Sequence, residues 1–441
     1  MKLNFRNIQK RYLILAIVAV VILIAGGTSG GAYYYYKHYL HKDTEATKDV
    51  HLAFIDEVWD TVKTNYWDKE PDDQLANLYK LGAEKILEKP QTLATADKAG
   101  VEGMVNLIMK DMAADKKKEF VTNLSDIVLA NLKPFGRSRL YSQKQEQTLR
   151  DTVQNKDPNA SDPTQNLYAA LGTTKDATQA EIVQSYQEKV KAVDPKTAEG
   201  QQKLAQLERA KAALANPDNR KVYDSSGVEP TVITKKIDSR TFYMHITKVS
   251  PQTFDEFQKA ANSTETSPGL NSLIVDLRGN IGGAIDILPY FLGPFIGPDS
   301  YAYDFFHQGD YTPYKTKLGW MPSLVKFKKV VILIDGESQS SAEVMAATFK
   351  KYNVGVVVGS HTKGWGTIEQ IMPMKTQLSP DEKYSMLMVH SITLRDDGEP
   401  IEGRGVDPTI NIADKNWDKQ LLDYYNLPSL VAAVKEALIL K

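Results

Sequence analysis

The chain has 441 residues, enough for more than one domain, and it contains no cysteine. Its 54 Lys and Arg residues nearly balance its 55 Asp and Glu residues, which leaves a net charge of -1. A nucleic-acid-binding face normally needs a basic excess, so this balance argues against nucleic acid as a partner. The lack of cysteine excludes disulfides, thiolate catalysis and cysteine-ligated zinc.

The first residues combine a basic segment with a long uncharged one. Residues 1–11 contain four basic side chains, and residues 12–36 contain no charge over 25 positions. A helix of that length crosses the roughly 30 Å of a bilayer's hydrocarbon core. Positive charge on the short leading side predicts a transmembrane signal anchor with a cytoplasmic N-terminus and an extracytoplasmic body in the cell membrane. A cleaved signal peptide is the alternative, because the most apolar part is short. Either way, the body is exported.

Helical periodicity dominates the next part of the chain, residues 51–153. Phe54, Val58, Val62 and Tyr66 recur every four residues and predict one apolar helix stripe. A segment rich in Asp, Asn and Pro follows and is typical of a linker.

A separate small helical unit is predicted over residues 166–227. Thr178 and Glu181 have the spacing of a capping box at the start of a helix. A second apolar stripe ends before Pro217, which prevents continuation of a helix. Two antiparallel helices follow from this pattern.

After residue 230, short apolar strands alternate with helical stretches. The strands include FYMHIT, SLIVDLR, KVVILID and VGVVVG, and this alternation predicts an α/β domain with a largely buried sheet. The segment LIVDLRGNIGG, residues 273–283, is a strand that ends in a glycine-rich turn, where backbone N–H groups can approach an anion or a developing oxyanion. In GESQSSAEVMA, residues 336–346, two serines lie at a strand-to-helix junction beside helix N-terminal amides. An ordinary turn and an ordinary N-cap are the alternatives.

These two segments, together with ITLRDDGEPIEGRGVDPTI, resemble the core of C-terminal processing peptidases (tail-specific proteases), and residues 51–153 resemble that family's helical part. The resemblance implies an α/β serine-peptidase core of the ClpP/crotonase-like kind that acts on protein or peptide substrates. It implies that Ser340 is the nucleophile and that the backbone amides of Gly282 and Ser341 bind the oxyanion. No metal or organic cofactor is implied, because the sequence has neither a His-rich ligand cluster nor a nucleotide loop.

One family position departs from this pattern. The family's general base is a lysine between two glycines, and this chain has Trp365 there, while Glu369 stands where the family has a glutamine. A serine hydroxyl needs an adjacent base to be nucleophilic at neutral pH. Lys363, two residues earlier, is the tentative substitute, and His361, His245 and His390 are chemical alternatives. Two interpretations stay open: a serine peptidase, with activity impaired by the missing lysine, or a pseudo-peptidase that acts as a peptide-binding or assembly scaffold.

The small helical unit resembles a J-domain, through NLYAALGTTKDATQAEIVQSYQEKV and LERAKAALANPDNRKVYDSSG. That family carries His-Pro-Asp in the loop between its long helices, whereas this chain has Asp194, Pro195 and Lys196, which inverts the charge pattern. The resemblance therefore favours a spacer or protein-docking module in place of a PDZ domain. A membrane-tethered co-chaperone is a rival function, but a chaperone partnership is not expected.

The predicted organisation has eight segments. They are a basic N-terminus (1–11), a transmembrane anchor (12–36), a linker (37–50), an N-terminal helical region (51–153), a linker (154–165), a J-domain-like module (166–227), the peptidase core (228–412) and a C-terminal helical tail (413–441).

Overall fold

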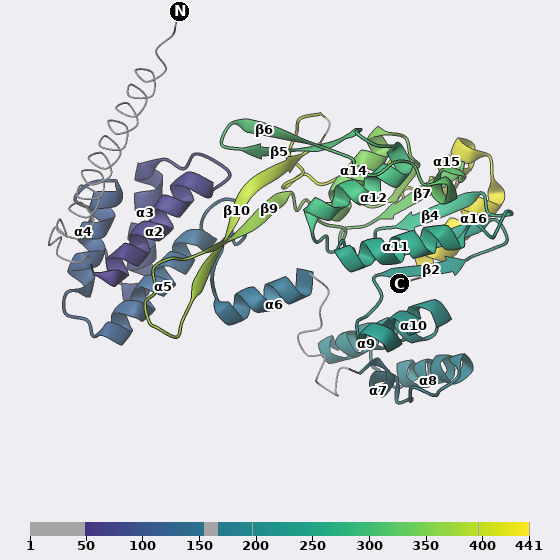
Figure 1. Cartoon of the computed structure of the whole chain (residues 1–441), viewed down its shortest axis with the longest axis horizontal. Coiled ribbons are helices and arrows are strands. Elements are labelled where there is room, and N and C mark those ends of the chain that lie inside the picture. Colours follow the sequence, from purple (N-terminus) through teal and green to yellow (C-terminus); the bar gives the residue numbers. More distant parts are fainter. Residues whose placement is uncertain (1–48, 154–165, 196, 396, 441) are drawn as a thin grey trace, which may run out of the picture. The chain divides into compact units, whose positions relative to one another are not determined.

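The computed structural model describes residues 49–153, 166–195, 197–395 and 397–440 (Figure 1). The chain divides into two compact units, Met1–Ala53 and Phe54–Lys441, and the features below belong to the second, apart from the first turn of the helix that begins at Val50. The anchor expected at 12–36 lies outside the described residues. Among the helices that the structure does describe, none combines the length and apolar character needed to cross a membrane.

Helices make up most of the N-terminal region. Their bounds are α2 Val50–Asn65, α3 Asp72–Leu87, α4 Lys98–Met109, α5 Ala114–Ala130 and α6 Gln143–Val153. The predicted α2 stripe is confirmed, because Phe54, Val58 and Val62 are fully buried and Tyr66 is 1% exposed. One strand was not expected here, β1 at Arg139–Ser142. With only Leu140 buried among its four residues, it shows no clear alternation in the sequence.

The strand β1 belongs to an antiparallel sheet with four strands from the second half of the chain. The order is β1-β10-β5-β6, and β9 also pairs with β10. The bounds are β5 Tyr301–His307, β6 Asp310–Lys315, β9 Thr367–Pro373 and β10 Tyr384–Leu394. In Figure 1, β9 and β10 run side by side as a long ribbon.

The second sheet contains the predicted α/β strands, in the order β11-β8-β7-β4-β3-β2. Neighbouring strands from β3 to β11 are parallel, and β2 is antiparallel to β3. Their bounds are β2 Val232–Lys236, β3 Thr241–Ile246, β4 Ser272–Asp276, β7 Lys329–Ile334, β8 Val356–Gly359 and β11 Ile410–Asn411. Every residue of β4 is buried, as expected for a parallel strand covered on both faces.

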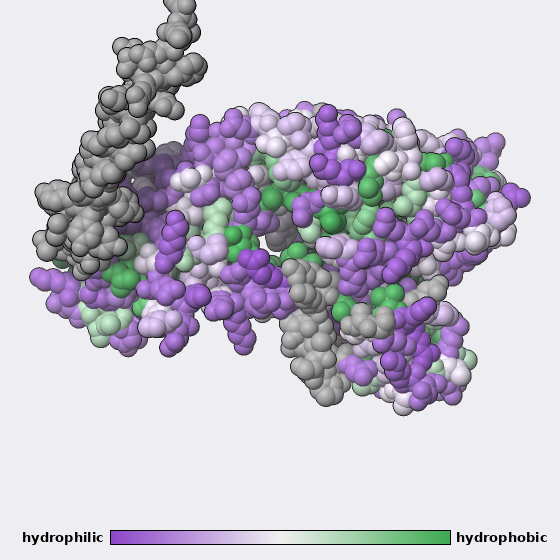
Figure 2. Space-filling model, viewed as in Figure 1, coloured by the Kyte–Doolittle hydropathy of each residue, from purple (hydrophilic) through white to green (hydrophobic). Residues whose placement is uncertain are grey.

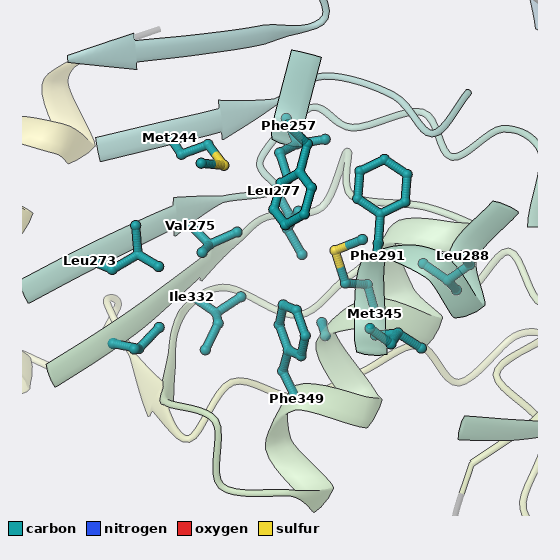
Figure 3. Close-up of a cluster of buried hydrophobic side chains, with 14 of the residues drawn as sticks. Met244, Phe257, Leu273, Val275, Leu277, Leu288, Phe291, Ile332, Met345 and Phe349 are labelled. Atoms are coloured by element: carbon teal, nitrogen blue, oxygen red, sulfur yellow. The ribbon is translucent and has the colours of Figure 1, made fainter. Parts of the chain in front are cut away.

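Helices cover both faces of this sheet. On one face, α11 (Pro251–Ser263), α12 (Leu288–Ile296) and α14 (Ser341–Lys351) enclose a core that includes Phe257, Phe291 and Phe349 (Figure 3). On the other face, α15 (Trp417–Tyr425) and α16 (Pro428–Ile439) pack through a separate apolar cluster. The short elements η3 (Ile285–Ile287) and α13 (Pro322–Val325) complete the domain. The predicted C-terminal tail is therefore two helices that complete the core, because the sheet needs cover on its second face.

The J-domain-like module has four helices and an apolar core of its own. The bounds are α7 Leu167–Leu171, α8 Gln179–Lys191, α9 Ala198–Leu214 and α10 Pro217–Ser226. The capping box is confirmed, since Thr178 N donates to Glu181 Oε2 at 2.6 Å and Glu181 N donates to Thr178 Oγ1 at 3.2 Å. Asp194 and Pro195 are exposed in the loop before α9, and Lys196 lies outside the described residues.

The visible face of the protein in Figure 2 is mainly hydrophilic, with smaller hydrophobic areas between. Large apolar side chains that are exposed, such as Leu107 and Trp320, come from separate parts of the sequence. Scattered residues of this kind are normal on a folded surface.

Candidate active site

Ser340 lies at the turn between β7 and α14 and has an unusual backbone. Its φ is 57° and its ψ is -124°, outside the regions that a residue with a Cβ prefers. Such a conformation costs about 1–3 kcal/mol and persists only where surrounding contacts hold it in place. A strained serine at a strand-to-helix turn exposes its hydroxyl beside the helix N-terminus.

The carboxylate of Glu343 holds this turn. It is fully buried and accepts four hydrogen bonds. Its Oε2 accepts from the backbone N–H of Ser340 and of Trp365, both at 2.8 Å. Its Oε1 accepts from Gly364 N at 2.7 Å and from Thr362 Oγ1 at 2.6 Å. One carboxylate therefore fixes the serine turn and the segment that carries the family's base position relative to each other.

The glycine-rich turn after β4 lies directly against Ser340. A Cβ added to Gly282, whose φ is +81°, would lie 2.6 Å from Ser340 Cβ and 3.0 Å from Ser340 Oγ. Asn280 is fully buried and supports this approach with two hydrogen bonds. Its side-chain Nδ2 donates to Ile246 O at 2.8 Å, and its backbone carbonyl accepts from Gln339 N at 2.9 Å. Only a residue without a side chain fits at position 282.

The two predicted oxyanion donors have different surroundings. Gly282 N donates to Asn280 Oδ1 at 2.8 Å, so this amide would have to exchange that bond for one to an oxyanion. Ser341 is the first residue of α14, where backbone N–H groups have no partner within the helix. Its side chain points away to Gly283 O, at 3.2 Å.

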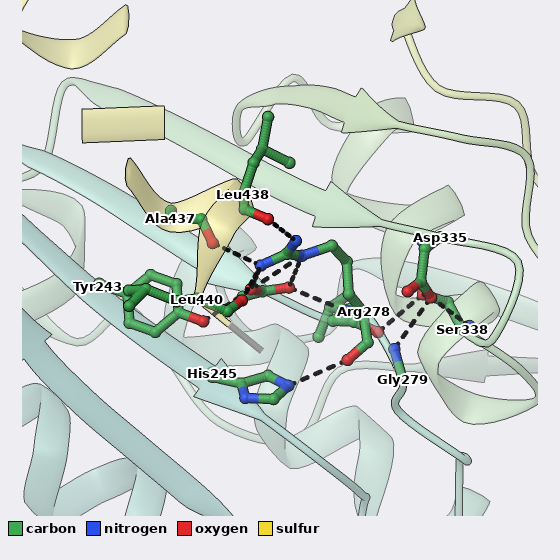
Figure 4. A network of polar contacts seen from close by, with 11 residues as sticks. Tyr243, His245, Arg278, Gly279, Asp335, Ser338, Ala437, Leu438 and Leu440 are labelled. Atoms are coloured by element: carbon green, nitrogen blue, oxygen red, sulfur yellow. Dashed lines mark hydrogen bonds and ion pairs between the residues drawn. The ribbon is translucent and has the colours of Figure 1, made fainter. Parts of the chain in front are cut away.

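A buried ion pair lies at the end of β4, beside the start of the glycine-rich turn (Figure 4). The Arg278 guanidinium contacts both carboxylate oxygens of Asp276, with the shortest distance 2.6 Å, and also donates to the carbonyls of Ala437, Leu438 and Leu440. The C-terminal end of α16 is thereby attached to the strand that positions Gly282.

The base position of the family is filled by an indole. The Arg137 guanidinium lies 3.3 Å from the centre of a ring of Trp365, and Arg137 also pairs with Glu402 at 3.0 Å. Trp365 Nε1 is 3.4 Å from Glu369 Oε1, which also accepts from Thr367 Oγ1 at 2.5 Å. Burial raises the pKa of Glu369 above its usual range.

Ser340 lines a cavity of about 210 Å³. The residues around it include Lys248, Gly282, Gly283, Ser340, Trp365 and Glu369. Ser340, Gly282, Trp365 and Glu369 are therefore brought together as the resemblance implies.

The structure does not bring the tentative base Lys363 into this cavity. The Lys363 side chain is 40% exposed, and its Nζ lies 3.9 Å from Glu337 and 5.8 Å from the centre of a Trp365 ring. The histidine alternatives also lie elsewhere. His361 contacts Asp407 at 2.8 Å, His245 Nε2 lies 3.0 Å from Arg278 O, and His390 stacks on His307.

Lys248 was not singled out from the sequence, although its position after a strand of the parallel sheet is a signal. Lys248 follows β3, Gly282 follows β4 and Ser340 follows β7, and these three strands are parallel neighbours. The carboxyl ends of parallel strands share one edge of a sheet, where ligand sites gather. Burial lowers the pKa of Lys248 below its usual range. In the described part of the chain, no group of three or more His, Asp or Glu side chains could hold a metal ion.

The chain is similar to known proteases over this domain. Residues 240–412 match the model of peptidase family S41, and residues 166–224 match the DnaJ domain. A carboxy-terminal processing protease of Bacillus subtilis is 28% identical over 185 residues, covering 42% of this chain and 36% of the relative. A carboxy-terminal-processing protease of Bartonella bacilliformis is 22% identical over 192 residues, with 42% and 41% covered. The match spans less than half of the length of each of these relatives.

Solved structures include a photosystem II D1 C-terminal processing protease, with a TM-score of 0.44 and 13% identity over 82% of this chain and 93% of that chain. A lipoprotein from Streptococcus agalactiae has a TM-score of 0.45 and 10% identity, with 85% and 96% covered. By its sequence matches, the chain carries a peptidase S41 domain related to C-terminal processing proteases, together with a DnaJ domain. Both predicted family resemblances are thus confirmed.

Proposed function

We propose that this chain is a serine-type endopeptidase that cleaves peptide bonds of exported proteins. The observation that supports it best is the strained Ser340 turn, which lies against Gly282 in a cavity. In the proposed reaction, Ser340 Oγ attacks the peptide carbonyl while the amides of Gly282 and Ser341 stabilise the oxyanion. The amine leaves with a proton, and water then releases the acyl group from the serine.

Peptide cleavage by the purified full-length chain tests this function. We expect the wild type to cleave an internally quenched peptide and to be labelled by a fluorophosphonate at Ser340. Ser340→Ala abolishes both signals, whereas Ser263→Ala, at an exposed serine that ends α11, retains them. Full cleavage by Ser340→Ala would show that the nucleophile is wrongly assigned.

A second candidate function is a pseudo-peptidase that binds extended peptides without cleaving them. The stack of Arg137 on Trp365 favours it, because these side chains occupy the family's base position. In that case the wild type binds the peptide by fluorescence anisotropy with no turnover. Trp365→Lys, which restores the family's amine, would then gain cleavage that Trp365→Phe does not.

The membrane anchor and extracytoplasmic location are proposed from the sequence of residues 1–36. We expect the full chain to sediment with membranes and to be digested by protease added outside intact cells. Replacing residues 1–36 with a cleavable signal peptide should release the body from the membrane. Sedimentation that persists in this variant would argue against the anchor.

The DnaJ domain is proposed as a spacer or docking module. The altered Asp194-Pro195-Lys196 loop lacks the imidazole and the following acid of the chaperone-binding loop. We expect no stimulation of the ATPase of a DnaK-type chaperone by the purified domain. Stimulation that Asp194→Ala removes would instead support the co-chaperone function.

A further inference from the structure

The backbone around Lys248 is held against the glycine-rich turn. Val249 N donates to Gly282 O at 2.8 Å, and Ile281 N donates to Thr247 O at 3.3 Å. Val249 and Gly283 also form a parallel bridge. Because both neighbours of Lys248 bond to this turn, the position of its Cα relative to Gly282 is fixed.

The pairing of residues 247–249 with the glycine-rich turn brings Lys248 near Ser340. Paired segments of this kind lie about 4.8 Å apart, and Gly282 is in contact with Ser340 on its other side. Lys248 and Ser340 line the same cavity, and the four methylene groups of a lysine give its amine a long reach within it. The sheet topology thus places a lysine and the serine around one cavity, and this lysine comes from an element that is not the family's lysine segment.

The surroundings of Lys248 leave its amine available. It is half-buried, and among the described residues it makes no hydrogen bond or ion pair. The negative charges of Glu229 and Glu256 raise the pKa of Lys248, but burial has the larger effect and lowers it overall. Glu369 is a further acidic residue that lines the same cavity. Substrate that fills the cavity would exclude more water and lower the pKa further, as in enzymes that use a desolvated lysine.

We propose that Lys248 is the general base that removes the proton from Ser340 Oγ. This inference rests on the proposed peptidase function and names the base that the function lacks. As the Oγ–carbon bond forms, the Ser340 proton moves to Lys248 Nζ. When the peptide C–N bond breaks, the ammonium returns that proton to the leaving amine. The neutral amine then activates the water that hydrolyses the acyl-serine.

Glu369 is the other ionisable group in this cavity, and it is less suited to the role. Its Oε1 accepts a hydrogen bond from Thr367 and faces Trp365 Nε1. Burial is the largest effect on this carboxylate and raises its pKa, but both donors stabilise the charged form and occupy Oε1. Lys248 is free of such partners among the described residues.

The absence of natural cysteine allows a direct test, because a cysteine introduced at position 248 is the only thiol in the chain. Lys248→Cys should lower kcat by about 10²–10⁴-fold, the usual contribution of a general base, with little change in peptide affinity. Alkylation with 2-bromoethylamine restores an amine of nearly the original length. Alkylation with (2-bromoethyl)trimethylammonium restores only the positive charge. The full-length protein is assayed both for peptide cleavage and for fluorophosphonate labelling of Ser340.

The proposal predicts that the amine-bearing product regains cleavage and labelling, with the rise of activity moved to lower pH because sulfur lowers the amine pKa. The trimethylammonium product stays inactive. A matched control is Lys259→Cys, at an exposed lysine on α11, which keeps full activity before and after each alkylation. Lys363→Cys tests the rival lysine in the same way.

The other possible results also decide the matter. Equal recovery with the two reagents would overturn the base assignment and leave a cation that binds substrate. Full activity of Lys248→Cys, or loss only in Lys363→Cys, would also overturn it. In another outcome, Ser340 is labelled only when an amine is present at position 248, and yet the wild type cleaves no peptide. That result would support Lys248 as the base and refute the peptidase function. No labelling and no cleavage by the wild type would refute both.

Discussion

Replacement of Glu343 by glutamine should loosen the site without changing its volume. The buried carboxylate accepts four hydrogen bonds, from the backbone amides of Ser340, Gly364 and Trp365 and from the Thr362 hydroxyl. A glutamine has only one acceptor oxygen, which can keep two of these bonds. Its NH₂ group would face the other two donors and accept nothing from them.

The magnitude follows from the number of bonds lost. Hydrogen bonds to a charged group contribute about 1.5–3 kcal/mol each, so the loss of two costs about 3–6 kcal/mol. A typical domain is stable by about 5–15 kcal/mol, and the change is therefore a large part of the total. Because the Ser340 turn and residues 362–365 share this carboxylate, both should open together.

Hydrogen exchange measures this effect locally, which suits a protein of more than one domain. In Glu343→Gln, the amides of 340, 364 and 365 should exchange faster, and fluorophosphonate labelling of Ser340 should fall. Glu337→Gln is the matched control, since Glu337 has a side chain 72% exposed and only a 3.9 Å contact to Lys363, worth less than about 1 kcal/mol. Unchanged exchange and labelling in Glu343→Gln would refute the assigned role of the carboxylate.

Three further predictions concern neighbouring features. Gly282→Ala should abolish labelling of the serine, because its Cβ would lie 2.6 Å from the serine Cβ and a φ of +81° is unfavourable for alanine. Arg278→Met should cost about 3–5 kcal/mol in stability, because it leaves a buried carboxylate without its cationic partner and frees two carbonyls of α16 and that of the following Leu440. Burial and the stacked His307 lower the pKa of His390, so the unfolded chain binds a proton at higher pH than the folded chain. Stability should therefore be complete above the ordinary histidine pKa of about 6.5 and decrease as the pH falls through it.

Each of these predictions has a control. Gly279→Ala has a similar φ of +67° but no atom within 4 Å of the added Cβ, so it should retain labelling, and equal loss in both variants would point to backbone strain alone. For Arg278→Met, a melting temperature equal to that of the wild type would contradict the expected loss of stability. His390→Gln should flatten the dependence of melting temperature on pH between about 5 and 7, and an unchanged slope would exclude this pair as its source.

Much of the active-site turn could be located from local sequence. LIVDLRGNIGG and GESQSSAEVMA carry their own signals, namely buried strands followed by a glycine-rich turn and by a helix N-terminus. Their strands do pair, as β4 with β7, and Gly282 does lie against Ser340. The family resemblance also places Trp365 at the base position, where the shared carboxylate of Glu343 holds its backbone.

Lys248 could not be found in this way. Nothing in the local sequence distinguishes it from other lysines, whereas the strand order places it beside Gly282. The same holds for β1, a short strand in the helical region whose partner β10 is far along the chain. Lys363 was favoured because it is near Trp365 in sequence, yet its side chain points to Glu337.

Local sequence patterns were enough to predict the α/β domain, the small helical unit and the strand-to-helix turns, because periodicity, glycine turns and capping act over a few residues. The family resemblance added the likeness to C-terminal processing proteases and to a J-domain. The tertiary structure was needed to show which ionisable groups share the cavity with Ser340 and that Arg137 stacks on Trp365. Those arrangements depend on strand order and on burial, which bring together the segments that follow β3, β4 and β7 and the start of β9. Strand order and burial cannot be deduced from any single segment of the sequence.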